Sequence, residues 1–253
     1  MLITYSTYTA IFYAWLCLAV IIFFFLLKVN APYGRHTVAG WGPQVDNRLG
    51  WFGMEFPALA VMLYFLIRCF PRQNPLLFIM MGLFCFHYIN RSFVFPFRLH
   101  TRGKKMPLII MLSGIFFNLV NTGLLGYYFM YFANYEMSWL TDWRFISGII
   151  LFVCGLWINW KADAILIGLR KPGEAGYTIP VGWLFRYISC PNLLGEMIEW
   201  AGFALLCWNM PALAFFTWTL ANLVPRALAH HRWYKNKFAD YPASRKAIIP
   251  YVC

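Results

Sequence analysis

The 253-residue chain is 61% apolar and 21% aromatic, and only 12% of its residues are charged. Soluble globular domains carry about 25% charged residues, so this composition excludes a water-soluble enzyme, a disordered chain and a disulfide-stapled secreted module. The formal net charge is +12, but the basic residues lie in short gaps between long apolar runs and form no dense basic face for nucleic acid. The composition predicts an all-α integral membrane protein that binds no nucleic acid.

Seven segments are apolar and long enough to be transmembrane helices, which need about 20 residues. They are residues 7–27, 51–70, 75–97, 107–132, 145–168, 193–209 and 211–228. The first segment is too long for a cleaved signal peptide and has no basic residues before it. Because no internal repeat and no long linker interrupts the chain, residues 1–253 are expected to form a single domain.

The basic residues predict how these helices are oriented. The outer loops carry only Arg68, Arg72 and Arg144, whereas the inner loops and the C-terminal tail carry the other loop cations. By the positive-inside rule, the N-terminus lies outside or in the lumen and the C-terminus lies in the cytoplasm. The longest irregular inner segment, residues 169–192, is a candidate binding loop.

Ionisable side chains inside membrane spans are costly, and they mark either a site or an internal network. The predicted spans include six such groups: Glu55, Arg91, Lys161, Asp163, Glu196 and Glu199. The simplest interpretation is that they pair with one another and hold helices together. Their spacing also allows a site, because Asn192, Glu196 and Glu199 share one helix face and Asn159 lies one turn before Asp163. Together with the basic inner loops, these groups suit a polar cavity for a large anionic ligand.

Several catalytic motifs are absent from the sequence. It has no Walker A loop, no GxGxxG after a strand, no HExxH and no GxSxG. The seven Cys residues show no CxxC spacing, so we expect no metal site and no redox pair. The residues alone therefore leave open a membrane enzyme or a transporter with an anionic ligand on the cytoplasmic side.

Six strings in the chain resemble the steroid 5α-reductase (3-oxo-5α-steroid 4-dehydrogenase) family. They are PYGRHT (32–37), WFGMEFP (51–57), GLFCFHYINRSFVFP (82–96), LRKPGEAGYTIP (169–180), CPNLLGEMIEWAGFAL (190–205) and HHRWYKNKFADYPASRKAIIPY (230–251). Enoyl-CoA and polyprenol reductases of the wider superfamily share the style of the C-terminal half. The region of Glu55 and Tyr88 favours the steroid branch.

The resemblance implies a seven-span enzyme that uses NADPH to reduce the C4–C5 double bond of a 3-oxo-Δ4-steroid. A hydride would pass to C5 on the α face while electron density moves toward the C3 oxygen, and C4 would then be protonated. Such an enzyme needs hydrogen-bond donors at the C3 oxygen, where charge develops.

The resemblance implies that Glu55 and Tyr88 are the catalytic pair at that oxygen. The sequence around Glu55 agrees, because a carboxyl group among aromatic side chains is disfavoured in its charged form and can stay protonated as a donor. Ketosteroid isomerase combines a neutral acid and a tyrosine in the same way. Without the resemblance, Tyr88 would be interpreted as an ordinary interfacial tyrosine.

The resemblance also implies a set of NADPH-binding residues. They are Arg91, Arg102, Lys104, Asn159, Asp163, Arg170, Tyr177, Asn192, Glu196, Arg226, His230 and Tyr234. Arg91, Arg102 and Lys104 would neutralise phosphates, with Arg as a bidentate donor and Lys as a point charge. The alternative for Arg102 and Lys104 is the ordinary basic bias of inner loops. Residues 245–250 are expected to form a surface segment that closes the cofactor cavity.

Trp51, Phe117 and Trp218 are the candidate walls of a flat apolar steroid slot, although general packing is a strong alternative for each. Two positions depart from the family pattern. Thr178 and Ser113 stand where relatives can carry a basic residue, which affects substrate or cofactor preference rather than reaction type.

Three other functions compete with steroid reduction. An enoyl-lipid or polyprenal reductase would keep the NADPH residues, a membrane methyltransferase would bind S-adenosylmethionine, and a transporter would show repeated broken helices. We expect a monomeric multi-pass protein whose partners are membrane lipids and a steroid entering from the lipid phase. Its location would be the endoplasmic reticulum membrane in a eukaryote or the cytoplasmic membrane in a bacterium.

Overall fold

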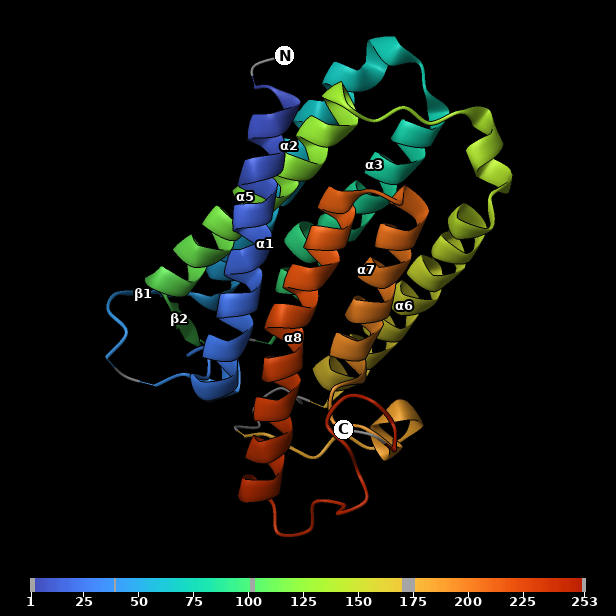
Figure 1. The fold of residues 1–253 in the computed structure, drawn as a ribbon. Helices are drawn as coiled ribbons and strands as arrows, with labels where there is room; N and C mark the ends of the chain where they lie inside the picture. Colours follow the sequence, from blue (N-terminus) through green and yellow to red (C-terminus); the bar gives the residue numbers. More distant parts are fainter. Residues whose placement is uncertain (1–2, 39, 101–102, 170–175, 252–253) are drawn as a thin grey trace. The chain divides into compact units, whose positions relative to one another are not determined.

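The computed structural model describes residues 3–38, 40–100, 103–169 and 176–251, and its fold is mostly helical (Figure 1). The main elements, in chain order, are α1 (Tyr5–Lys28), β1 (Gln44–Asp46), α2 (Asn47–Cys69), α3 (Pro75–Ile89), α4 (Phe95–Arg98), β2 (Lys105–Pro107), α5 (Leu108–Tyr131), α6 (Trp143–Gly168), α7 (Pro191–Cys207) and α8 (Met210–Lys237). Short 3₁₀ helices cover Gly34–His36, Phe70–Arg72, Met137–Thr141 and Trp183–Arg186.

Within the described residues, six helical segments are long and apolar enough to cross a membrane. They are Tyr5–Lys28, Asn47–Arg72, Pro75–Arg98, Leu108–Tyr131, Trp143–Gly168 and Met210–Lys237. The remaining expected span is α7, which forms where predicted but has 17 residues, fewer than the roughly 20 that a membrane crossing needs. The multi-span helical architecture agrees with the prediction, while the count of seven and the orientation of the termini stay predictions.

The chain divides into two compact units. The first unit comprises Met1–Ala14, Ala31–Ile146 and Leu206–Ala212, and the second comprises Trp15–Asn30, Ser147–Leu205 and Leu213–Cys253. The expectation of a single domain stays a prediction.

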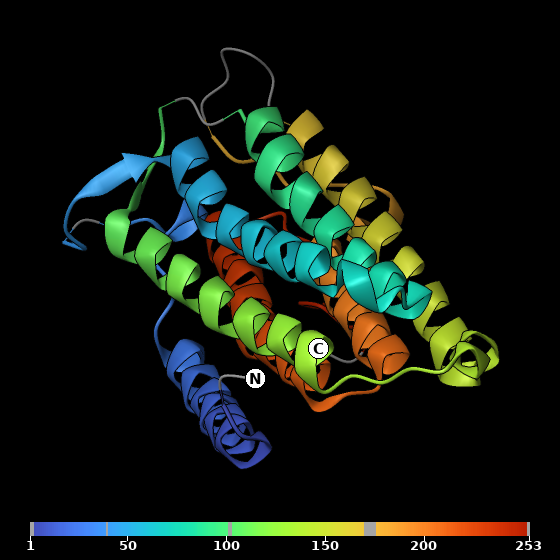
Figure 2. The ribbon, with the colours of Figure 1, turned by 90° about the horizontal axis from the view of Figure 1, so that it is seen from above.

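In the first unit, a small antiparallel sheet joins the beginnings of α2 and α5. Strand β1 pairs with β2, and each strand leads directly into its helix. Outside the strand pairing, the Leu108 amide donates to the Pro43 carbonyl at 2.8 Å. Figure 2 shows α2 and α5 side by side beyond this sheet. The purely helical prediction did not include these strands, because three residues are too few to show a period of two.

The span predicted over residues 75–97 is one continuous helical segment that contains a π-helical turn. A π-helical turn, Asn90–Val94, separates α3 from α4. Pro96 follows in the first turn of α4, and a proline ring collides with the carbonyl four residues earlier in a regular α-helix. The wider π turn relieves that collision, and such turns are frequent at functional sites. It begins two residues after Tyr88 and contains Arg91.

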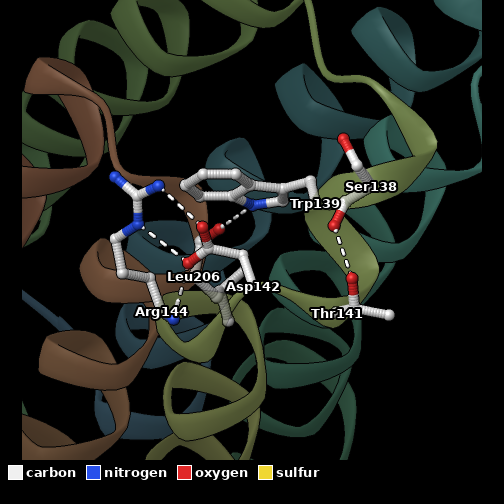
Figure 3. A network of polar contacts seen from close by, with 6 residues as sticks. All are labelled: Ser138, Trp139, Thr141, Asp142, Arg144 and Leu206. Atoms are coloured by element: carbon white, nitrogen blue, oxygen red, sulfur yellow. Dashed lines mark hydrogen bonds and ion pairs between the residues drawn. The ribbon is translucent and has the colours of Figure 1, made fainter.

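A polar network in the first unit fixes the segment that precedes α6 (Figure 3). Two nitrogens of Arg144 donate to the two carboxylate oxygens of Asp142 at 2.8 and 2.7 Å. The Arg144 guanidinium lies 4.3 Å from the centroid of the Trp139 ring, and the Trp139 indole N–H donates to the Leu206 carbonyl at 2.9 Å. The hydrogen bonds from Arg144 lower the pKa of Asp142 to about 2, so this network is ionised at neutral pH.

In the second unit, α6 and α7 pack with their backbones in close contact (Figure 1). A side chain at Gly195 would collide with the Asn159 amide and would lie 2.7 Å from the Gly155 carbonyl. Small residues at helix crossings allow such close approach in membrane proteins. This crossing brings the polar side chains of α6 against the beginning of α7.

Helix α8 is longer than the span predicted over residues 211–228. It extends to Lys237 and contains Pro225 in its interior. The prediction ended where the apolar run ends, but the helix continues through the polar residues beyond it. His230 and Tyr234 therefore lie on a helix one turn apart, rather than in a loop.

Candidate functional site

The first unit contains a carboxylate–guanidinium pair inside the predicted membrane region. Glu55 lies on α2, and its Oε1 is 3.6 Å from Nη2 of Arg91; the Glu55 and Arg91 side chains are 14% and 10% exposed. The Arg91 guanidinium also lies 4.5 Å from the ring centroid of Phe95 and 5.3 Å from that of Trp51. The resemblance implied that Arg91 neutralises cofactor phosphates, and that role stays a prediction; the structure gives it a carboxylate partner and two aromatic faces.

Tyr88 is buried on α3 and is held from two sides. Its ring centroid lies 4.7 Å from that of Phe84. Its hydroxyl donates to the Asn118 side-chain oxygen at 3.2 Å. The Asn118 side-chain nitrogen donates in turn to the Met54 carbonyl at 2.6 Å. Since Met54 precedes Glu55 in α2, this chain of bonds links Tyr88 to the backbone beside the carboxyl group.

The three candidate substrate residues have different surroundings. Trp51 contacts Arg91 and lies edge-on to Phe95 at 5.8 Å. Phe117 is half-buried on α5, next to Asn118. Trp218 belongs to the second unit, where it is buried with its ring centroid 4.5 Å from that of Trp15.

The second unit holds a compact cluster of amide and carboxylate groups at the crossing of α6 and α7. The Asn159 side-chain nitrogen donates to the Asn192 carbonyl at 3.0 Å. The Asn192 side-chain nitrogen donates to Asp163 Oδ1 at 3.1 Å. Asn159 and Asp163 are 1% and 6% exposed. Thus three residues that the resemblance assigned to cofactor binding form one hydrogen-bonded set, as the helical spacing of Asn159 and Asp163 suggested.

Other expected cofactor residues lie on α7 and α8. Glu196 is half-buried, one turn after Asn192, whereas Glu199 is fully buried in the same helix. Arg226, His230 and Tyr234 recur every four residues on α8, so they follow one stripe of that helix.

The aromatic side chains near the end of α8 pack together. The Tyr234 ring is stacked on Tyr241 at 5.3 Å. Tyr177 lies edge-on to Trp233 at 5.1 Å. Thr178, the neighbour of Tyr177, is exposed.

Three further cations were expected to bind the cofactor, namely Arg102, Lys104 and Arg170. Lys104 is exposed, and its carbonyl accepts a hydrogen bond from the Asn47 amide at 3.1 Å. Arg102 and Arg170 lie outside the residues that the structure describes. Ser113 is exposed on α5, and its hydroxyl donates to the Ile110 carbonyl at 2.8 Å.

A second polar hub, which the sequence did not reveal, lies at Ser189. Its hydroxyl lies 2.7 Å from Nδ1 of His231 and 2.6 Å from the hydroxyl of Tyr241, and it donates to the Lys246 carbonyl at 3.0 Å. Burial raises the pKa of Tyr241 above its ordinary value, so the phenol is neutral at physiological pH. The hub ties the residues before α7 to α8 and to the C-terminal segment.

The expected closing segment at residues 245–250 is attached at the same place. The Ser189 and Cys190 amides donate to the Lys246 and Ala247 carbonyls at 2.8 and 3.2 Å. Arg245 is 4% exposed and donates to the Pro180 carbonyl at 3.1 Å. The segment therefore packs into the second unit, and closure of a cofactor cavity stays a prediction.

Asn118 had a signal that the sequence interpretation did not use. It is an amide in the middle of an apolar span, and polar groups at membrane depth mark sites or networks. Ser189 had no comparable signal, since a serine in a loop is ordinary.

Comparison with known proteins places these residues in a family. The family model described as 3-oxo-5-alpha-steroid 4-dehydrogenase matches residues 104–253. The 3-oxo-5-alpha-steroid 4-dehydrogenase 2 of Homo sapiens is 46% identical over 227 residues, which cover 87% of each chain. The steroid 5-alpha-reductase DET2 of Gossypium hirsutum is 42% identical over 234 residues, which cover 90% of each chain. Because the identity exceeds 40% and the alignments cover 87% and 90% of both chains, this chain belongs to the steroid 5-alpha-reductase (3-oxo-5-alpha-steroid 4-dehydrogenase) family.

Proposed function

We propose that this protein reduces the C4–C5 double bond of 3-oxo-Δ4-steroids to the 5α-dihydro product, with NADPH as reductant. The observation that carries the proposal is the pair of Glu55 and Tyr88 on adjacent helices of the first unit, in a chain 46% identical to a human 3-oxo-5-alpha-steroid 4-dehydrogenase. Both groups can donate a hydrogen bond to a carbonyl oxygen when protonated.

Glu55 and Tyr88 act on the C3 oxygen of the steroid. Reduction at C5 moves electron density onto that oxygen, and donors placed there stabilise the enolate-like transition state. Tyr88 is buried, and a hydrogen bond from a neutral donor is strongest where water is excluded. Glu55 can donate only when neutral, so its carboxylate must first take up a proton from solvent and give up the ion pair with Arg91. The neutral carboxyl group then donates to the C3 oxygen. After the hydride has reached C5, C4 takes a second proton from solvent.

The residues of the second unit fit NADPH by their chemistry. Two amides and a carboxylate at Asn159, Asp163 and Asn192 suit the hydroxyl and carboxamide groups of a nicotinamide nucleotide. Arg226 is a cation for its phosphates, and Tyr234 offers an aromatic face. Arg170, Tyr177, Glu196 and His230 complete this set. Arg102 and Lys104 are cations of the first unit and are proposed separately as phosphate contacts. When bound, NADPH supplies the hydride.

The lipid phase supplies the substrate in this proposal. A steroid is apolar and flat, and Trp51 and Phe117 of the first unit offer apolar surfaces for its rings. Trp218, in the second unit, is a separate candidate for such a surface. The protein would act as a monomer, without a metal, in the endoplasmic reticulum membrane of a eukaryote or the cytoplasmic membrane of a bacterium.

A substrate panel tests the proposal on the purified protein in nanodiscs. NADPH binding is followed by fluorescence, and NADPH oxidation is followed with progesterone, testosterone, an enoyl-CoA and a polyprenal. We expect NADPH oxidation with the two steroids and a 5α-dihydro product by mass spectrometry. Turnover of only the enoyl-CoA or the polyprenal would show that the substrate is another conjugated enone and not a steroid. Binding of S-adenosylmethionine without NADPH binding would overturn the reductase proposal.

A further inference from the structure

We propose that Asn118 is a positioning residue that holds the phenol of Tyr88 in place and accepts a hydrogen bond from it before substrate arrives. This inference rests on the proposed role of Tyr88 and adds a residue to it. Asn118 lies on α5, is 4% exposed and connects two helices, since it contacts Tyr88 on α3 and Met54 on α2.

The direction of both hydrogen bonds follows from the Met54 carbonyl. A backbone carbonyl can only accept, so the group of Asn118 that faces it at 2.6 Å must be the NH₂ end of the amide. The two ends of an amide are otherwise hard to distinguish in a structure. With the nitrogen fixed at Met54, the amide oxygen faces Tyr88, and the Tyr88 hydroxyl must be the donor of the 3.2 Å bond.

This fixed direction has a consequence for catalysis. A phenol has a single proton, and a hydroxyl proton bonded to Asn118 is not bonded to a substrate carbonyl. The O–H must therefore turn from the Asn118 oxygen to the C3 oxygen as the steroid binds. Asn118 thus keeps the buried hydroxyl satisfied in the free protein, where an unbonded buried donor would be costly. It also keeps the phenolic oxygen at one place beside α5.

A double-mutant cycle on turnover separates positioning from general packing. Asn118→Leu should lower kcat by about 10- to 100-fold, since small displacements of a catalytic group cost up to about 100-fold. In a Tyr88→Phe background the same substitution should lower kcat by less than about twofold, because the hydroxyl it positions is already absent. The Kd for NADPH should be the same in all four proteins.

Thr122→Val is the matched control. Thr122 lies one turn after Asn118 on α5 and is 0% exposed, so its replacement perturbs the same helix without removing the bond to Tyr88. We expect its kcat to equal that of the parent protein. An equal fall of kcat for Asn118→Leu in both backgrounds, or an equal fall for Thr122→Val, would show a packing effect and overturn the inference.

If the parent protein reduces no steroid, only the proposed function is defeated. A second double-mutant cycle, on stability instead of turnover, then tests the inference. The melting temperature is measured for the same four proteins with NADPH present. Non-additive losses for Tyr88→Phe and Asn118→Leu would confirm the hydrogen bond and support the inference. Additive losses would overturn it, whatever the substrate.

Discussion

Replacement of Glu55 by Gln and by Leu distinguishes a neutral donor from an ionised carboxylate. Gln has nearly the same shape as Glu and still donates through its NH₂ group, whereas Leu has a different shape and no donor. Loss of one donor at a developing oxyanion costs about 10²–10³ in kcat, and we expect this loss for Glu55→Leu. Exchange of one neutral donor for another changes a hydrogen bond by about 0.5–1.5 kcal/mol, so Glu55→Gln should lose about tenfold or less.

The ion pair adds a stability effect that must be measured separately. Removing one partner of a buried pair costs about 3–5 kcal/mol, and the Glu55 and Arg91 side chains are only 14% and 10% exposed. The Phe95 ring face, 4.5 Å from the Arg91 guanidinium, offsets part of that cost. We therefore expect Glu55→Leu to lower the free energy of unfolding by about 2 kcal/mol. The amide oxygen of the introduced Gln can accept a hydrogen bond from Arg91, so we expect Glu55→Gln to lower the free energy of unfolding by about 1 kcal/mol.

The assay is steady-state turnover of progesterone in nanodiscs, with the melting temperature and the NADPH Kd of each variant. Glu136→Leu serves as the control, because Glu136 is an exposed carboxylate of the same unit. Its kcat should match that of the parent protein. Equal loss of kcat in Glu55→Gln and Glu55→Leu, with folded protein in both, would refute the donor role and indicate that the charged pair with Arg91 matters instead.

The remaining predictions concern the other three groups of contacts. Tyr88→Phe should lower kcat by about 10²–10³ with the fluorescence-measured NADPH Kd unchanged; a parallel loss of NADPH affinity would move Tyr88 to the cofactor site. Asn192→Leu removes the donor to Asp163 and should raise the NADPH Kd by about 10- to 100-fold in the same titration, whereas an unchanged Kd would exclude the cluster from cofactor binding. Asp142→Asn should lower the melting temperature, because bonds to Arg144 lower the carboxyl pKa from 3.8 to about 2. The difference in melting temperature between the parent protein and Asp142→Asn should be constant at neutral pH and vanish as the pH falls from 3.8 toward about 2. A difference in melting temperature that grows on acidification would contradict this prediction.

Hydropathy was sufficient to predict the helices, because each span needs a long apolar run whatever its partners are. Their ends were less predictable. Helix α8 continues to Lys237 beyond its apolar part, and the span around Tyr88 contains a π turn. Both features depend on how polar residues and Pro96 are accommodated locally, which hydropathy does not encode.

The candidate site was predictable where its residues share one helix. The spacing of Asn159 and Asp163 predicted a common face, and the structure brings both to Asn192. Contacts between helices were not predictable in the same way. The bond from Tyr88 to Asn118 spans 30 residues, and the hub at Ser189 joins a loop, α8 and the C-terminal segment. Such contacts follow from helix packing, and a single sequence carries no pattern for them.

Isotope transfer tests the central claim most directly. The protein in nanodiscs is given progesterone and NADPH that carries deuterium at both C4 positions of the nicotinamide, and the product is analysed by mass spectrometry and NMR. The account predicts a 5α-dihydro steroid with deuterium bound to C5 and a solvent-derived hydrogen at C4. Deuterium at C4 of the steroid, a 5β product, or NADPH binding without any transfer to the steroid would contradict it.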